Sequence, residues 1–212
     1  VDLDAFHPDH RQGPAALALR ERLAPRGETI VGYVGRVAPE KGLERLRALQ
    51  GAKGVQVVVV GDGPGMAAAR RALAPLGAVF LGQRTGAALA AAYAALDVFV
   101  HTGAEETFGQ TLQEAAAAGL PVVAPRAGGP IDLVDHGITG FLYEPDSQRG
   151  LRDAVRTLAE SPAMRARMGE AGRRRVLQRP WPRVCEELVE HYAAAQRHAL
   201  TGALPAPSPA IV

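Results

Sequence analysis

The stretch EETFGQTLQEAAAAGLPVVAP, residues 105–125, passes from an acidic loop through an alanine-rich helix into an apolar strand. Four residues of its middle part recur at helical spacing and predict a buried stripe: Leu112, Ala115, Ala116 and Gly119. Because these residues are small, such a helix can lie close to a sheet. The strand PVVAP that follows is apolar on both faces, which is typical of a parallel sheet covered by helices on both sides.

The same alternation of strands and helices runs through most of the chain. Strands are predicted at residues 29–35, 55–61, 78–82, 97–101, 121–125 and 140–144. Helices are predicted at residues 39–49, 65–77, 87–96, 108–118, 130–135, 147–160, 163–178 and 181–199. This pattern predicts an α/β fold: a doubly wound, mostly parallel Rossmann-like sheet of about six strands with helices on both faces, followed by a helical C-terminus.

The boundaries of the predicted domain follow from changes in composition. Residues 1–14 are polar and broken by proline, so we expect a linker there. Residues 15–178 form the predicted Rossmann-like domain, residues 179–199 a separate terminal helix, and residues 200–212 a flexible tail without any pattern. Because the chain starts at Val1 without a methionine, we expect a fragment or a processed product.

Composition excludes several classes of function. Of the 212 residues 47% are hydrophobic and 22% charged, which is enough to build a core. The net charge of +2 is too small to require a nucleic-acid partner. No apolar run approaches the roughly 20 residues that span a bilayer. The one cysteine, Cys185, fits a reducing compartment, so we expect a cytoplasmic protein, with a peripheral position at the inner face of the membrane as an alternative.

The first strand-to-helix turn, GRVAPEKG at residues 35–42, carries two cations. Arg36 leaves the strand and Lys41 lies just inside the next predicted helix. Lysine is rare in this chain, with only Lys41 and Lys53 present. Two cations at a helix start on the ligand side of such a sheet predict an anion site, although a solvated surface pair remains the alternative.

Two further turns are rich in glycine. GDGPG at residues 61–65 includes Gly63 and suggests a dinucleotide fingerprint, but that motif should follow the first strand. The misplaced motif argues against an NAD site. It does not exclude one, because Asp62 ends the second strand where a ribose-binding acid would lie. The pair Gly128–Gly129 allows close approach of a ligand. Ordinary turn formation explains both turns equally well.

The fourth turn holds Glu106 in the loop and Glu114 further along the helix. The helix is predicted to begin near Phe108 and Gly109, so its free N–H groups, including that of Gln110, should point into the crevice. Helical side chains lean toward the N-terminus, so Glu114 can also reach the crevice. One acid could contact one end of a polyhydroxylated ligand and the other acid a second end. Acids near a helix N-terminus also stabilise the helix. This simpler explanation fits Glu105 better than it fits Glu106 and Glu114.

Other motifs have simpler explanations. Asp2 and Asp4 match an Asp-x-Asp metal motif but lie in the linker, so we expect no metal there. The arginines of residues 172–179, with Arg165 and Arg167, could contact anionic lipid, although a solvated helix face is the simpler interpretation. His101 ends a strand at the crevice, and a structural role is expected for it.

Several of these stretches together resemble one family. GRVAPEKGLERL, VVVVGDGP, VFLG and EETFGQTLQEAAAAGLPVVAPRAGGPIDLVDHGITGFLYEP resemble the C-terminal domain of GT-B retaining glycosyltransferases of family 4. Glu106 and Glu114 match the family's E-x7-E motif. The resemblance covers about residues 1 to 200. Within the family, ETFGQTLQEA and GGPIDLV are most similar to bacterial GDP-mannose-dependent α-mannosyltransferases.

The resemblance implies a role for each matching residue. Arg36 and Lys41 would hold the donor diphosphate, Glu106 the transferred sugar and Glu114 the ribose. The sugar and phosphates would be approached by the loop residues Phe108, Gly109, Gln110 and Thr111, and Gly63 would also contact the donor. The base would be contacted by Leu81, Gly82 and Gln83. Asp132 stands where many members have glutamate, which leaves the role of that position open.

The resemblance also implies partners and a reaction. A hexose, expected to be mannose from GDP-mannose, would pass to a lipid or glycan acceptor without a cofactor or a metal. An acceptor-binding domain is expected to precede Val1, with the last helix packing back on it, which would leave Trp181 and Leu188 exposed here. Without that domain the fragment should be inactive. A GT-B epimerase, an NAD oxidoreductase domain and a non-catalytic nucleotide-sugar sensor remain alternatives.

Overall fold

A six-stranded parallel sheet forms the centre of the molecule. The computed structural model describes residues 1–178 and 181–201, with the backbone alone at 181–183 and 198–201. In chain order the strands are β1 Thr29–Val34, β2 Val55–Val60, β3 Val79–Gly82, β4 Val98–Val100, β5 Val122–Pro125 and β6 Gly140–Tyr143. All neighbours pair in parallel, in the order β3-β2-β1-β4-β5-β6. The predicted doubly wound sheet is therefore confirmed.

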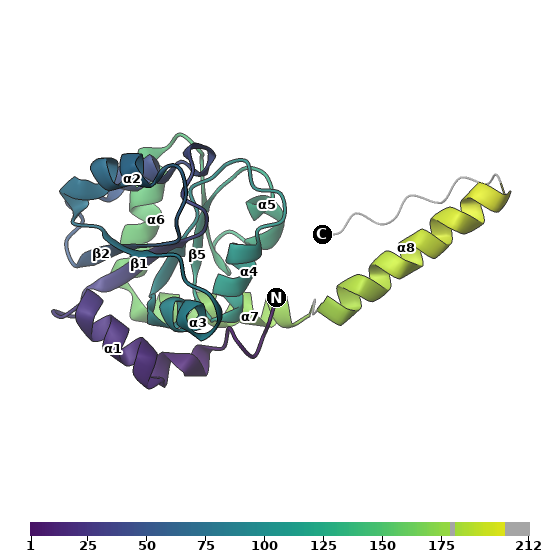
Figure 1. Cartoon of the computed structure of the whole chain (residues 1–212), viewed down its shortest axis with the longest axis horizontal. Helices are drawn as coiled ribbons and strands as arrows, with labels where there is room; N and C mark the ends of the chain where they lie inside the picture. Colours follow the sequence, from purple (N-terminus) through teal and green to yellow (C-terminus); the bar gives the residue numbers. More distant parts are fainter. Residues whose placement is uncertain (179–180, 202–212) are drawn as a thin grey trace.

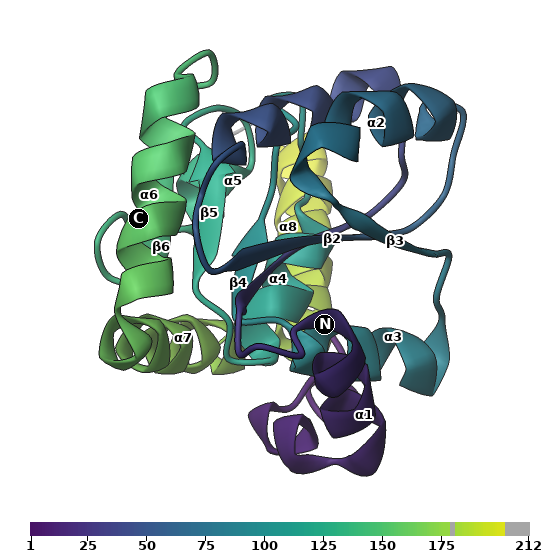
Figure 2. The ribbon, with the colours of Figure 1, turned by 90° about the vertical axis from the view of Figure 1, so that its left-hand side faces the viewer.

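Helices cover both faces of this sheet. The α-helices are α1 Pro14–Leu23, α2 Met66–Leu73, α3 Gly86–Ala95, α4 Gln110–Ala117, α5 Pro130–Leu133, α6 Gln148–Glu160, α7 Pro162–Leu177 and α8 Trp181–Thr201. The 3-10 helices are η1 Pro8–Gln12, η2 Pro39–Lys41, η3 Leu43–Leu49 and η4 Ala74–Leu76. Figure 2 shows α2 on one side of the sheet and α1 and α3 on the other.

Alternating strand residues divide the core into two apolar layers. In β1, Ile30 and Val34 pack with α1, α3 and α4, whereas Val31 and Tyr33 pack with η3, α2 and α6. The β-branched strand residues fit this two-sided burial, since every residue of β1 is buried. β1 and β4 pair between these layers, at the point where the strand order reverses.

The predicted helix at residues 39–49 is wrong as a single element. Gly42 adopts a left-handed backbone with φ of 59° and separates η2 from η3. The predictions also missed α1 as a helix, because Pro14 and the polar residues before it pointed to irregular structure.

The opening segment, expected to be a linker, packs against the domain. Val1 and Phe6 belong to the apolar layer that also contains Tyr93 of α3. Arg11 pairs with the buried Asp97, whose other oxygen accepts a hydrogen bond from the backbone N–H of Ile30 at 2.8 Å. A buried charge is stable only with such partners, so these contacts fix the segment to the start of β4.

The terminal helix α8 extends away from the sheet layers (Figure 1). Leu188, Val189 and Tyr192 on it are exposed, as expected for Leu188. The tail was predicted at residues 200–212, but α8 continues through Thr201. Residues 202–212 and the side chain of Trp181 lie outside the described residues. Across the described chain, no helix has the length and apolarity needed to cross a membrane.

Candidate functional site

A pocket of about 790 Å³ opens at the carboxyl ends of β1, β2 and β3. Its walls come from these strand ends, from the loop after β3 and from α3 and α4: Val34, Gly35, Arg36, Val60, Gly61, Asp62, Gly63, Gln83, Arg84, Leu89, Thr111 and Glu114. Ligands of doubly wound sheets bind at this edge, where the strand order reverses. Arg36, Gly63, Gln83, Thr111 and Glu114 were predicted site residues, and the structure brings them together here.

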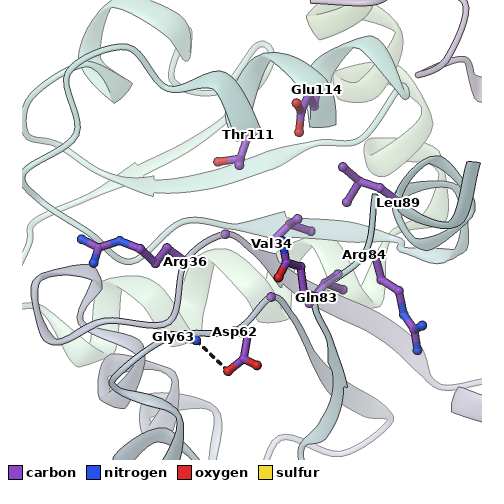
Figure 3. Close-up of a pocket in the computed structure, with 12 residues that line it drawn as sticks. Val34, Arg36, Asp62, Gly63, Gln83, Arg84, Leu89, Thr111 and Glu114 are labelled. Carbon is purple, nitrogen blue, oxygen red and sulfur yellow. Dashed lines mark hydrogen bonds between the residues drawn. The ribbon is translucent and has the colours of Figure 1, made fainter. Parts of the chain in front are cut away.

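Glu114 forms the α4 side of the pocket (Figure 3). The Tyr93 hydroxyl donates to its Oε2 at 2.8 Å and the Gln110 side-chain amide donates to its Oε1 at 3.2 Å. Burial, with a further contribution from Glu114, raises the pKa of Tyr93 well above its ordinary value. Tyr93 therefore stays protonated and acts as a fixed donor, so the carboxylate is held in one orientation.

The opposite wall comes from the turns after β2 and β3. Asp62 accepts a hydrogen bond from the Gly63 amide at 2.7 Å, and Gln83 and Arg84 follow β3. Figure 3 shows Asp62 and Gln83 across the pocket from Glu114. Of the three residues expected to contact a base, only Gln83 lines the pocket; Leu81 and Gly82 do not. The Gly82 carbonyl accepts a hydrogen bond from the Gly61 amide at 2.8 Å.

Two contributors to the site were missed by the sequence predictions. Arg84 lines the pocket, and its place directly after the predicted base-contacting residues could have suggested it. Tyr93 holds Glu114. It is the only aromatic residue in its alanine-rich helix, which is the one signal that marked it.

Glu106 and Lys41 form a second cluster next to the loop before α4. The Lys41 ammonium lies 2.9 Å from Oε2 of Glu106, and the Gly109 amide donates to Oε1 at 3.0 Å. Burial alone would raise the pKa of Glu106, but the amide and the ammonium outweigh it and hold this pKa below its ordinary value. The two residues expected to bind different parts of a donor are therefore paired with each other.

Arg36 has a carboxylate partner as well. It pairs with Glu40, and 61% of its side chain is exposed. An exposed pair contributes little, typically about 0–1 kcal/mol, so Arg36 can turn toward an anion at low cost. The Lys41–Glu106 pair, with exposures of 20% and 17%, is harder to separate.

The start of α4 differs from the prediction. The helix begins at Gln110, with Gly109 as its N-cap residue, instead of near Phe108. The Gly109 amide, expected to be free, is bound by the Glu106 carboxylate. Phe108 is half exposed, and Gln110 directs its amide to Glu114. The loop thus uses one of its acids to satisfy the helix terminus.

The Gly128–Gly129 pair is explained by packing. A Cβ on Gly128 would lie 2.6 Å from the carbonyl oxygen of Glu106, and one on Gly129 would lie 2.8 Å from that of Thr107. The Gly129 amide also donates to the Glu106 carbonyl at 2.6 Å. The glycines let two loops meet, and this contact fixes the backbone of Glu106.

The other motifs have structural partners. Asp2 accepts hydrogen bonds from the amides of Asp4 and Ala5, as in a simple turn. In the described part of the chain, no three histidine, cysteine, aspartate or glutamate residues are placed to hold a metal ion.

The basic helix α7 is tied into the domain. Arg165, Arg173 and Arg175 donate to backbone carbonyls of the domain. These bonds favour a structural explanation for three of the arginines that could contact lipid. Arg179, in the same basic run, lies outside the described residues.

The topology and the pocket at the strand reversal define a Rossmann-like α/β domain of the GT-B type. The chain belongs to the family described as glycosyl transferases group 1, whose sequence model matches residues 18–175.

Curated relatives cover nearly the whole chain. It is 50% identical over 195 residues to the GDP-mannose-dependent alpha-mannosyltransferase of Mycolicibacterium smegmatis. The aligned region covers 92% of this chain and 50% of the relative. Its identity to the protein of that name from Corynebacterium glutamicum is 40%, over 91% of this chain and 46% of the relative. The chain spans about half the length of the curated relatives it matches.

Solved structures show the same architecture. Anabaena HepE, in complex with UDP and glucose, superposes with a TM-score of 0.80 at 28% identity, covering 91% of this chain and 55% of that one. The C-terminal domain of a glycosyl transferase group 1 protein from Francisella tularensis has the same fold, with a TM-score of 0.71 at 22% identity. It covers 84% of this chain and 97% of that one.

Proposed function

We propose that this chain is the donor-binding half of a retaining glycosyltransferase of family 4, which moves mannose from GDP-mannose to a lipid or glycan acceptor. The observation that carries the proposal is the placement of the two acids of the α4 region. Glu114 lies in the 790 Å³ pocket, and Glu106 lies beside Lys41. The names of the mannosyltransferase relatives support mannose and guanine in particular.

Transfer of the sugar mainly requires stabilisation of the diphosphate leaving group. As the bond between the anomeric carbon and the diphosphate oxygen breaks, negative charge grows on the diphosphate. A preorganised donor at such a charge typically contributes about 2.7–4 kcal/mol. Arg36 and Lys41 would supply this stabilisation once the diphosphate displaces Glu40 and Glu106 from them. We therefore propose that no metal is needed.

The acids would orient the donor. Glu114, held by Tyr93 and Gln110, would accept hydrogen bonds from the ribose hydroxyls. Glu106 would accept them from hydroxyls of the mannose. Retention would follow from attack of the acceptor hydroxyl on the face from which the diphosphate leaves. The acceptor would be held by a second domain outside these 212 residues, since the relatives are about twice as long as the matched region.

A panel of nucleotide sugars tests this proposal. Thermal shift with GDP-mannose, UDP-glucose, GDP, UDP and NAD should give the largest stabilisation with GDP-mannose. A largest shift with UDP-glucose would correct the donor, and a largest shift with NAD would overturn the glycosyltransferase assignment. An epimerase would release free sugar from the donor without an acceptor. A sensor would show no turnover even when the second domain is present.

A further inference from the structure

His101 is buried at the carboxyl end of β4, beside the cluster of Glu106 and Lys41. Its side chain is 2% exposed, and neither ring nitrogen has a hydrogen-bond partner among the described residues. Buried polar side-chain atoms nearly always have a partner, and each exception calls for an explanation. Plain core packing, the role expected from the sequence, does not explain a polar ring at this position.

The geometry gives the ring a neighbour just beyond hydrogen-bonding range. Nε2 of His101 lies 3.9 Å from Oε2 of Glu106, the oxygen that Lys41 holds at 2.9 Å. A Cβ on Gly103 would lie 3.4 Å both from this Nε2 and from Cδ of Lys41. The imidazole edge and the lysine stem therefore flank Gly103 and share one carboxylate oxygen as their polar neighbour.

The surroundings keep this imidazole neutral. Burial lowers the pKa of His101 to about 4; Glu106 and the backbone of Gly103 oppose this shift, whereas Lys41 adds to it. Two other groups meet this strand end through the backbone. The Tyr143 hydroxyl donates to the His101 carbonyl, and Arg45 donates to the Thr102 carbonyl. A neutral imidazole still carries one N–H, so it can donate a single hydrogen bond at neutral pH.

We propose that His101 is a positioning residue that holds Glu106 toward the donor sugar when the diphosphate draws Lys41 away. The inference rests on the proposed function. Lys41 cannot bind a diphosphate fully while it is paired with Glu106. Once Lys41 turns, Oε2 of Glu106 loses its strongest donor in a half-buried place. An approach of about 1 Å brings Nε2–H of His101 into hydrogen-bonding range of that oxygen.

This exchange of partners has a specific energetic signature. Bare GDP also draws Lys41 away, but it leaves the place of the sugar open to water, which can solvate Glu106. Bound mannose would fill that place and needs Glu106 held toward its hydroxyls. Loss of the imidazole N–H should therefore weaken GDP-mannose and leave GDP nearly unchanged. The expected loss for one hydrogen bond to a charged group is roughly 10–150-fold in affinity.

A double-mutant cycle by titration calorimetry on the 212-residue chain tests the proposal. His101→Phe keeps a ring without the N–H, and His101→Gln keeps a donor. The first should weaken GDP-mannose roughly 10–150-fold and GDP less than about 2-fold, and the second should restore most of the affinity. In a Glu106→Ala background, which lacks the acceptor, His101→Phe should have no further effect. The matched control His191→Phe, on the exposed side of α8, should change neither affinity.

Other outcomes separate the inference from the proposed function. If His101→Phe weakens both ligands equally, or acts equally in both backgrounds, the residue is structural and the inference is overturned. If the unmutated chain binds neither ligand, the proposed donor fails and the inference with it. Should His101→Phe not fold, ¹⁵N imidazole spectra of the unmutated chain decide. GDP-mannose must shift the Nε2 resonance of a neutral ring more than GDP does, and an unmoved Nε2 would overturn the inference.

Discussion

Two glutamates of one motif have different electrostatic environments. Glu106 is held by an ammonium and a backbone amide, whereas Glu114 is held by a phenol and a carboxamide, both neutral. Glu106 is therefore tied to the charge of whatever Lys41 binds, and Glu114 is not. This difference suits one acid to a sugar next to a diphosphate and the other to a ribose further away.

The cations should dominate nucleotide affinity. Arg36→Ala is expected to weaken GDP binding by about 1.5–3 kcal/mol, the range for hydrogen bonds to charged groups. Lys53→Ala, the matched control at an exposed site outside the pocket, should leave the affinity unchanged. Titration calorimetry measures both, and an unchanged Kd for Arg36→Ala would remove this residue from the site.

His101 should make stability depend on pH. Its pKa is about 4 in the folded chain, against an ordinary value of 6.5. Between these pH values the unfolded chain binds a proton that the folded chain does not, so stability falls as the pH drops from 6.5 toward 4. The effect is at most about 3 kcal/mol. Urea unfolding at pH 5 and pH 7 should show a smaller difference for His101→Phe than for the unmutated chain, and an equal difference would contradict the burial argument.

At the scale of elements, the loop before α4 is fixed from two sides. The Gly109 amide binds the Glu106 carboxylate, and the Gly128–Gly129 turn packs against the backbone of the same residue. An acid on a loop is held in place only when its backbone is fixed as well. The turn after β5 is thus part of the site without contacting a ligand.

Gly128→Ala tests this coupling. The new Cβ would lie 2.6 Å from the Glu106 carbonyl at a backbone φ of 58°, so the loop must move. We expect GDP-mannose affinity to fall while GDP affinity stays close to that of the unmutated chain. The control Gly27→Ala has a similar φ of 79° and nothing within 4 Å of its Cβ, so it reports backbone strain alone. Equal effects of both variants on sugar-nucleotide binding would contradict the coupling.

Elements with a strong local pattern could be predicted from the sequence, and pairings could not. The six strands lie close to their predicted ranges, because each is a short apolar run between turn residues. The pairing of Lys41 with Glu106 joins residues 65 positions apart and depends on how two loops meet. The break of the predicted 39–49 helix depends on the backbone of Gly42. The separation of Glu114 and Glu106 into two environments likewise required the structure.

At the scale of the whole molecule, the described residues form a six-stranded sheet with helices on both faces. A core of this size is large enough for independent stability. The proposed transfer also needs an acceptor held about 3–3.5 Å from the anomeric carbon in a closed cleft. We therefore expect the 212-residue chain to fold, to bind GDP-mannose weakly and to transfer nothing. Incubation with labelled GDP-mannose and mannoside or lipid acceptors measures this, and product from this chain alone would contradict a site shared between two domains.

Metal independence is a second whole-molecule prediction. If Arg36 and Lys41 neutralise the diphosphate, EDTA should leave the affinity for GDP unchanged. Calorimetry with EDTA and then with excess magnesium provides the measurement. Binding that is lost in EDTA and restored by magnesium would show that a cation, and not the two side chains, holds the diphosphate.

The central claim is that the two acids of α4 and its loop bind the two ends of a nucleotide sugar. Titration of GDP and GDP-mannose into the unmutated chain, Glu106→Ala and Glu114→Ala tests it most directly. Glu114→Ala should weaken both ligands by a similar factor, and Glu106→Ala should weaken GDP-mannose more than GDP. The reverse pattern would show that the roles of the acids are exchanged, and unchanged affinities in both variants would contradict the site.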